Sequence, residues 1–198
     1  MKPCGKEKKQ RLEASALRLF LEQGVNETSV NDIVKDAKLA KGTFYVYFKD
    51  KGELIHKMLT KMNLTLIETL ISQAKDDVNV GIDSWPCAFV RHFIQYFKEQ
   101  PHLLKLLHHS MLLDDRASLI LPILEQKVTD FDPFIQSFQR SDETKEAAGI
   151  RFLLTMEICA AVCFNALFYH QPDSLENITE IFYAMMHGSF ASDQGGIS

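Results

Sequence analysis

The sequence predicts an all-α protein of about nine helices, in which an N-terminal three-helix domain is joined by a long fourth helix to a C-terminal helical bundle. Apolar residues recur at spacings of three and four along most of the chain, which is the helical period. The 9 glycines and 6 prolines are few for 198 residues and fall mainly where these periodic segments end. We therefore expect two domains, residues 1–50 and residues 51–198.

The first helix is predicted from Lys6 to Gln23, with Gly24 as a left-handed C-terminal cap. A short second helix should begin after Ser29, because its hydroxyl can cap the backbone amides while Asp32 reaches back to the Ser29 amide, as in a capping box. The inward faces of these two helices are expected to be Leu12, Ala16, Leu19, Phe20, Val30, Ile33, Val34 and Ala37.

A turn at Lys38 and Leu39 then leads to a predicted third helix from Ala40 to Tyr47. Asp50 has the side chain and the position of an N-cap for the long fourth helix, which should run towards Ala74. The C-terminal domain should contain five further segments: a helix striped by Phe89, Phe93, Tyr96 and Phe97 and ended by Pro101; His102 to Leu113; Ala117 to Phe138, interrupted at Pro122 and Pro133; Thr144 to Tyr169; and Ser174 to Phe190.

Charge is divided unevenly between the two predicted domains. Residues 1–50 hold ten Lys and Arg against seven Asp and Glu, a balance of +3, whereas residues 51–198 hold twelve against nineteen, a balance of −7. The sum is the net charge of −4. A basic module on an acidic body is the distribution expected if only the N-terminal end meets phosphates.

The predicted second and third helices have the arrangement needed to read the major groove of DNA, a short exposed helix held by another across a tight turn. Phe44 and Phe48, four residues apart, should fix the third helix to the core. The other side chains offer one ammonium and three hydroxyl groups for phosphates and base edges, those of Lys41, Thr43, Tyr45 and Tyr47. Gly42 allows close approach of the backbone to DNA.

Residues 11–55 resemble the tetracycline-repressor (TetR) family of bacterial transcription regulators. The resemblance lies in Ala14, Leu17, Phe20 and Gly24, in Thr28-Ser29-Val30 with Asp32-Ile33 and Ala37, and in Lys41-Gly42-Thr43-Phe44-Tyr45-Val46-Tyr47-Phe48 with Lys51 and Leu54. It implies that Lys41, Gly42 and Tyr45 approach bases. It also implies that Thr28, Ser29, Thr43, Tyr47 and Lys51 bind phosphates, Lys51 together with the positive end of the fourth helix's dipole.

Two positions depart from the family pattern. Lys38 stands where the turn usually has glycine, and it would need a left-handed backbone at a cost of about 1 kcal/mol. Ala40 stands where serine usually caps the recognition helix, so a side-chain cap and one phosphate contact should be missing.

The resemblance further implies a homodimer on a palindromic operator of double-stranded DNA and a small-molecule effector, which we expect to be apolar. The dimer interface is predicted on the last two helices, at Phe152, Met156, Cys163, Leu167, Ile178, Phe182 and Met185, burial within one subunit being the alternative. Effector contacts are predicted at Phe89, Phe93, Tyr96, His108, Met111 and Phe164, plain core packing being the alternative. A regulator controlled by a protein partner, with no small-molecule effector, is a second hypothesis.

Other function classes find little support in the sequence. Nothing resembles a catalytic triad, a phosphate-binding glycine loop or a zinc-protease motif, so we expect neither an enzyme nor a cofactor. His102, His108 and His109 lack acidic or cysteine partners at ligand spacing, and the neighbouring Cys159 and Cys163 are typical of buried thiols, so no metal is expected. No wholly apolar stretch reaches about 18 residues, which predicts a cytoplasmic protein without a membrane span.

Overall fold

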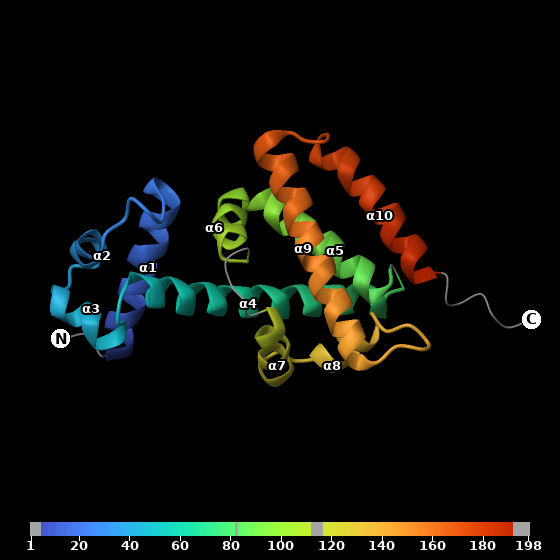
Figure 1. The fold of residues 1–198 in the computed structure, drawn as a ribbon, viewed down its shortest axis with the longest axis horizontal. Helices are drawn as coiled ribbons and strands as arrows, with labels where there is room; N and C mark the ends of the chain where they lie inside the picture. The colour runs from blue at the N-terminus through green and yellow to red at the C-terminus, as the bar shows by residue number, and fades with distance from the viewer. Residues whose placement is uncertain (1–4, 82, 112–116, 192–198) are drawn as a thin grey trace, which may run out of the picture. The chain divides into compact units, whose positions relative to one another are not determined.

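The computed structural model describes residues 5–81, 83–111 and 117–191, and within these it contains ten helices and no strand. The helices are α1 (Gly5–Gln23), α2 (Val30–Asp36), α3 (Lys41–Tyr47), α4 (Lys51–Asn79), α5 (Trp85–Glu99), α6 (Pro101–Met111), α7 (Ala117–Lys127), α8 (Phe131–Gln136), α9 (Lys145–Tyr169) and α10 (Leu175–Ala191) (Figure 1). The predicted all-α class is thus confirmed. The contacts divide the chain into two compact units, residues 1–62 and 63–198, with the boundary inside α4.

The N-terminal unit is a small core of helices α1, α2 and α3 with the beginning of α4. Leu12, Ile33, Phe44 and Leu54 contribute one fully buried side chain from each of the four helices. The rings of Phe44 and Phe48 lie 5.5 Å apart between centroids, and both are buried. This packing fixes which face of α3 is turned away from the protein.

The helix ends in this unit follow the sequence closely. Gly24 has φ of +97° and its amide donates to the carbonyl of Phe20, as expected of a glycine that ends a helix. The capping box of α2 is present in both directions between Ser29 and Asp32. Asp50 accepts a hydrogen bond from the amide of Glu53 at 2.8 Å and so caps α4.

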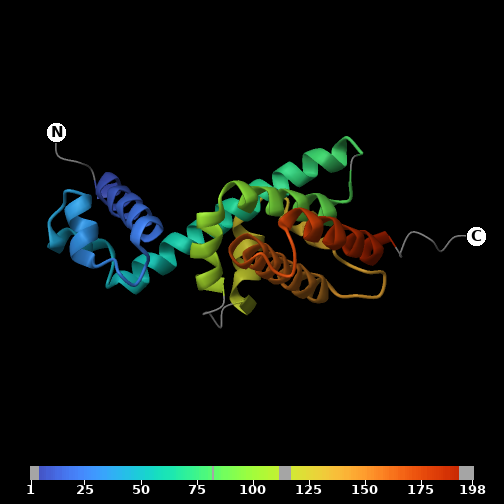
Figure 2. The same ribbon diagram turned by 90° about the horizontal axis from the view of Figure 1, so that it is seen from above.

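The C-terminal unit is organised around α9, which packs against α5, α6, α8 and α10 (Figure 1 and Figure 2). Its centre is a cluster of phenylalanine rings. Phe134 lies 5.0 Å from Phe89 and 5.4 Å from Phe152 between centroids, and Phe138 lies 5.6 Å from Phe152. These four side chains are almost completely buried, so this cluster is the core of the unit.

Two predictions about the helices need correction. Helix α4 continues five residues beyond the expected Ala74, to Asn79. Pro122 lies inside α7 and does not interrupt it. The break comes instead at Asp130, which has φ of +60° and precedes α8. Pro133 lies in the first turn of α8, where a missing amide proton costs no intrahelical hydrogen bond.

Helix α9 also corrects the expectation about membrane spans, because its length and composition would suffice to cross a bilayer. A core helix of a soluble protein passes the same test, so one such helix is weak evidence of a span. Helix α9 packs against four other helices of the described chain, and 33% of its apolar window is buried there.

Candidate nucleic-acid interface

Helix α3 presents a clear division between a buried and an exposed face. Phe44 and Phe48 are 0% and 1% exposed, whereas Tyr45 and Val46 are 52% and 74% exposed. Lys41 and Gly42 are also exposed, at the first turn. A large aromatic and a large aliphatic side chain turned to solvent on a seven-residue helix are available for contact with a groove.

Gly42 is not required by the fold of the unit. A Cβ atom built at this position would meet no heavy atom within 4 Å, and Gly42 is not among the residues with positive φ. The absence of a side chain therefore leaves open space beside the backbone of α3, which is the property that we predicted for close approach to DNA.

Lys38 and Ala40, the two residues that depart from the family pattern, have the backbone conformation and the missing cap that we predicted for them. Lys38 has φ of +53°, in the left-handed region. Ala40 occupies the N-cap of α3 with an extended backbone and gives no side-chain hydrogen bond. On the backbone, the Thr43 amide donates to the Ala40 carbonyl at 2.8 Å. Helix α3 thus begins without the side-chain acceptor that such a helix prefers.

Ser29 remains at the surface although it is engaged by Asp32. The Ser29 amide donates to the Asp32 carboxylate at 2.9 Å, and the Asp32 amide donates back to the Ser29 hydroxyl oxygen at 3.2 Å. Hydrogen bonds from the hydroxyl and amide of Ser29 lower the pKa of Asp32. The start of α2 is therefore rigidly held, and its serine is exposed as a phosphate-binding group should be.

Thr28 is placed differently from its predicted phosphate-binding role. Its side chain is 0% exposed, and its hydroxyl donates to the Gly24 carbonyl at 2.7 Å while accepting from the Gln23 amide group at 3.2 Å. A hydroxyl that is buried and satisfied within the protein is not available to a phosphate. The side chain of Thr28 therefore shapes the loop between α1 and α2.

Lys51 makes internal contacts that the sequence did not suggest. Its ammonium group donates to the carbonyls of Val25 and Thr28, at 2.9 Å each, and so ties the loop between α1 and α2 to the first residue of α4. An ammonium group has three donors, which leaves one for a phosphate. Thr43 and Tyr47, the other two predicted phosphate contacts, are half-buried.

Val46 is a candidate that we did not select from the sequence, although it is the most exposed large apolar residue in the described part of the chain. The signal was available, because residue 46 lies between the inward positions 44 and 48 and must point outward on a helix. Lys9 and Lys57 are two further cations of the unit, with their ammonium groups 5.8 Å and 5.9 Å from the ring centre of Phe48.

None of the predicted effector residues whose side chains are described lines the cavity between α7, α8 and α9. Phe89 and Phe93 are 1% and 0% exposed and pack within the aromatic core, so the core alternative describes their surroundings. Tyr96 and Phe164 are half-buried, against Phe97 and Phe168. The side chains of His108 and Met111 lie outside the described residues. This cavity is lined by Leu121, Phe131, Ile135 and Leu153, among others.

The predicted dimer residues fall largely on the inner side of α9 and α10. Phe152, Met156, Cys163, Ile178 and Phe182 are buried within the subunit, and Leu167 is half-buried. Only Met185 is strongly exposed, at 62%. The apolar side chains turned to solvent on these two helices are different ones: Ile150, Leu154, Ile158, Tyr169 and Ile181. Burial within one subunit, the alternative named from the sequence, therefore describes most of the predicted residues.

The two neighbouring cysteines of α9 behave as core residues. Burial raises the pKa of Cys163 to about 12 and also raises the pKa of Cys159. The described residues contain no group of three or more His, Cys, Asp or Glu side chains that could hold a metal ion.

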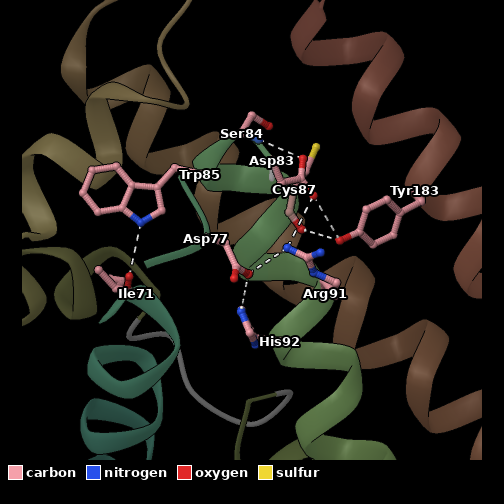
Figure 3. A network of polar contacts seen from close by, with 9 residues as sticks. All are labelled: Ile71, Asp77, Asp83, Ser84, Trp85, Cys87, Arg91, His92 and Tyr183. Carbon is pink, nitrogen blue, oxygen red and sulfur yellow. Dashed lines mark hydrogen bonds and ion pairs between the residues drawn. The ribbon is translucent and has the colours of Figure 1, made fainter. Parts of the chain in front are cut away.

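A polar network links the end of α4 with α5 and α10 (Figure 3). Asp77 accepts from Arg91 and contacts the His92 ring nitrogen, both at 2.7 Å. The hydroxyl of Tyr183 donates to the Cys87 carbonyl at 3.0 Å, and burial raises the pKa of Tyr183. These contacts fix α10 to α5 within the C-terminal unit.

The chain matches a family model for its N-terminal part. Residues 13–58 match the model described as bacterial regulatory proteins, tetR family. An HTH-type transcriptional regulator of Staphylococcus aureus strain USA300 is 39% identical over 77 residues, which are 39% of this chain and 41% of the relative. The match therefore spans less than half the length of these curated relatives.

Solved structures extend the similarity in fold to nearly the whole chain. A putative TetR-family transcriptional regulator from Syntrophomonas wolfei has a TM-score of 0.61 with 19% identity, covering 94% of this chain and 96% of that one. Thermus thermophilus FadR, a TetR-family transcriptional repressor solved in complex with lauroyl-CoA, has a TM-score of 0.59 with 18% identity, covering 90% and 92%. At these identities the likeness establishes a shared fold. The family match itself concerns residues 13–58, the part that contains α2 and α3.

Proposed function

We propose that this chain, a member of the TetR family of transcriptional regulators by its N-terminal domain, is a cytoplasmic repressor that binds a palindromic operator as a homodimer. A small, apolar effector then lowers its affinity for the operator. The observation that carries the proposal is the face of α3, where Tyr45, Val46 and Lys41 are turned to solvent while Phe44 and Phe48 hold the helix to its core.

The residues that we assign to DNA follow from their exposure. Lys41, Gly42 and Tyr45 are assigned to base edges, with Val46 added because an apolar side chain can contact a thymine methyl group. Ser29, Thr43, Tyr47 and Lys51 are assigned to phosphates. Thr28 is withdrawn from this set because its side chain is buried.

A homodimer is part of the proposal because one recognition helix reads only a few base pairs, and two related by two-fold symmetry read a palindrome. Its interface is assigned to those exposed apolar side chains of α9 and α10 that do not line the cavity between α7, α8 and α9, on two helices that pack against each other. Ile158, Ile181 and Met185 are 50%, 63% and 62% exposed, which is unusual for such large apolar groups. A second copy of the chain would bury them.

The effector part of the proposal is supported by the fold that the chain shares with a ligand-bound protein. The solved complex of Thermus thermophilus FadR shows that a protein with this fold can hold an amphipathic ligand. A ligand that prefers the form with low operator affinity shifts the population towards that form by its difference in affinity, typically about 1–3 kcal/mol.

The decisive experiment measures binding of the full chain to the DNA upstream of its own gene by fluorescence anisotropy. We expect Tyr45→Ala to weaken binding by about fivefold to 150-fold without lowering Tm, because the side chain is exposed and loses base contacts worth about 1–3 kcal/mol. Val80→Ala is the control, since this valine is 70% exposed but follows α4 and lies outside both the DNA-binding face and the assigned dimer interface.

Binding should also weaken steeply with rising salt, because phosphate contacts release counterions. Equal affinity for the upstream fragment and for a shuffled fragment of the same composition would argue against an operator. An unchanged affinity in Tyr45→Ala would remove α3 from the interface.

A further inference from the structure

The C-terminal unit contains a groove that the DNA-binding site does not use. It lies between α7, α8 and α9 and has a volume of about 560 Å³. Its walls are mainly apolar and include Leu121, Phe131, Ile135 and Leu153. Volumes of about 300–1,000 Å³ with apolar walls are typical of sites for small molecules.

The groove depends on the close approach of α7 to α9 at Gly149. A Cβ atom at this position would lie 2.9 Å from a methyl carbon of Leu121, so a larger residue would require this leucine side chain to shift. Gly149 is buried and lines the groove itself. The apolar surface is therefore formed by side chains of three helices and not by one exposed stripe.

The charged side chains that line the groove are mainly negative. Three carboxylates, those of Glu125, Glu146 and Glu157, face one ammonium group, that of Lys145. The ammonium group is already bound by Glu125 at 2.6 Å and by Asp132 at 2.9 Å, and these bonds raise the pKa of Lys145. Because two carboxylates neutralise it, Lys145 cannot offer a net positive charge to a ligand.

The two remaining carboxylates differ in their surroundings. Glu146 lies in the first turn of α9, where its backbone amide and Thr144 lower its pKa and the positive end of the helix dipole offsets its charge. Glu157 lies in the middle of α9 and forms no ion pair with a described residue. Glu157 is thus the uncompensated charge beside the apolar walls.

We propose that this groove binds an amphipathic organic cation, with the apolar body against Leu121, Phe131 and Leu153 and the positive charge beside Glu157. An anion of the same shape is disfavoured by the same carboxylate. The proposal rests on the effector part of the proposed function and gives that effector its charge. It also moves the effector away from Phe89 and Phe93, which are buried in the core.

The test uses two probes of nearly the same size and shape but opposite charge, tetraphenylphosphonium and tetraphenylborate, titrated into the full-length protein by calorimetry. We expect saturable binding of the phosphonium and at least tenfold weaker binding of the borate. Glu157→Gln should weaken phosphonium binding about twofold to fivefold, as expected for a charge contact open to solvent. It should strengthen borate binding.

Glu180→Gln is the matched control, because it removes one exposed carboxylate from α10, outside the groove. Leu153→Ala, which shortens the wall, should weaken both probes. Binding of the two probes with equal affinity, or an unchanged phosphonium affinity in Glu157→Gln, would overturn the proposal. Operator binding is measured on the same samples. A protein that binds DNA but not the phosphonium would refute the proposed cation site and leave the DNA-binding proposal standing.

Discussion

Lys38 holds a backbone conformation that is costly for any residue with a Cβ atom. Its φ of +53° lies in the left-handed region, which costs a non-glycine residue about 1–2 kcal/mol. Glycine removes this cost. Its greater conformational freedom in the unfolded chain, however, offsets about half of the resulting gain in stability. We expect Lys38→Gly to raise the free energy of unfolding by about 0.5–1 kcal/mol in urea denaturation.

Lys35→Gly is the control for Lys38→Gly, since it removes an exposed lysine from the last turn of α2 three residues earlier. There the substitution should lower the free energy of unfolding by about 1 kcal/mol, because glycine is a poor helix former. A Lys38→Gly variant that unfolds at lower urea than the parent would show that the lysine side chain stabilises the turn.

Lys51 combines an internal role with its predicted phosphate contact. Its ammonium group donates to the carbonyls of Val25 and Thr28, and charged hydrogen bonds of this kind contribute about 1–3 kcal/mol. We therefore expect Lys51→Ala to lower both Tm and operator affinity. Lys49→Ala is the comparison, because Lys49 is exposed two residues earlier and should change operator affinity alone. An unchanged Tm in Lys51→Ala would contradict the internal role.

At the scale of the helix, the start of α2 should be sensitive to acid. Hydrogen bonds from Ser29 lower the pKa of Asp32, so its carboxylate stabilises the folded form fully above the ordinary pKa of an aspartate, about 3.9. That contribution is lost as the pH falls through the lower, folded pKa. We expect Asp32→Asn to unfold more easily than the parent at pH 7 and to approach it near pH 2–3, as measured by urea denaturation.

Asp142→Asn serves as the control for this pH dependence, since Asp142 is exposed in the turn before α9. Its difference from the parent should stay small at both pH values. If Asp32→Asn and the parent differed by the same free energy of unfolding at pH 7 and near pH 2–3, the charge of Asp32 would not contribute to stability.

The helix ends of the N-terminal unit could be predicted because they depend on neighbours in sequence. Ser29 with Asp32, Asp50 with Glu53, and Gly24 each satisfy backbone groups within a few residues. The left-handed backbone at Lys38 was predictable from the family pattern for the same reason. The burial of Thr28 was not, because it depends on the path of the loop that Lys51 closes from 23 residues away.

The face of α9 could not be predicted because its sequence is apolar on nearly every side. Phe152, Met156 and Cys163 are buried while Ile150, Leu154 and Ile158 are exposed, although both sets are equally hydrophobic. Amphipathic periodicity can assign a buried face only when the other face is polar. The contacts of Lys145 with Glu125 and Asp132 join residues of different helices, which periodicity also cannot locate.

At the scale of the molecule, the uneven distribution of charge agrees with separate roles for the two parts of the chain, DNA binding for the first and ligand binding for the second. The basic excess lies in residues 1–50 with the exposed face of α3, and the acidic excess lies in the part that contains the groove. Positive potential near α3 increases the rate of encounter with DNA, and the negative body disfavours contact of the rest of the chain with phosphates. The same acidity favours cations over anions at the groove.

The exposed apolar side chains of α9 and α10 lead to the last prediction, which concerns assembly. Replacing Ile158 and Ile181 together by glutamate should prevent dimerisation, because each would place a charge within an apolar interface. We expect sedimentation velocity to show a monomer, with a far-ultraviolet circular dichroism spectrum close to that of the parent.

Val80→Glu is the control for this variant, because Val80 is 70% exposed but follows α4 and lies outside the assigned interface. It should leave the dimer intact. Since a monomer presents one copy of α3, its affinity for the palindrome should fall to its affinity for a half-site, whereas Val80→Glu should bind as the parent does. A double variant that remains dimeric would exclude Ile158 and Ile181 from the interface. Dimerisation would then have to depend on another surface of the chain.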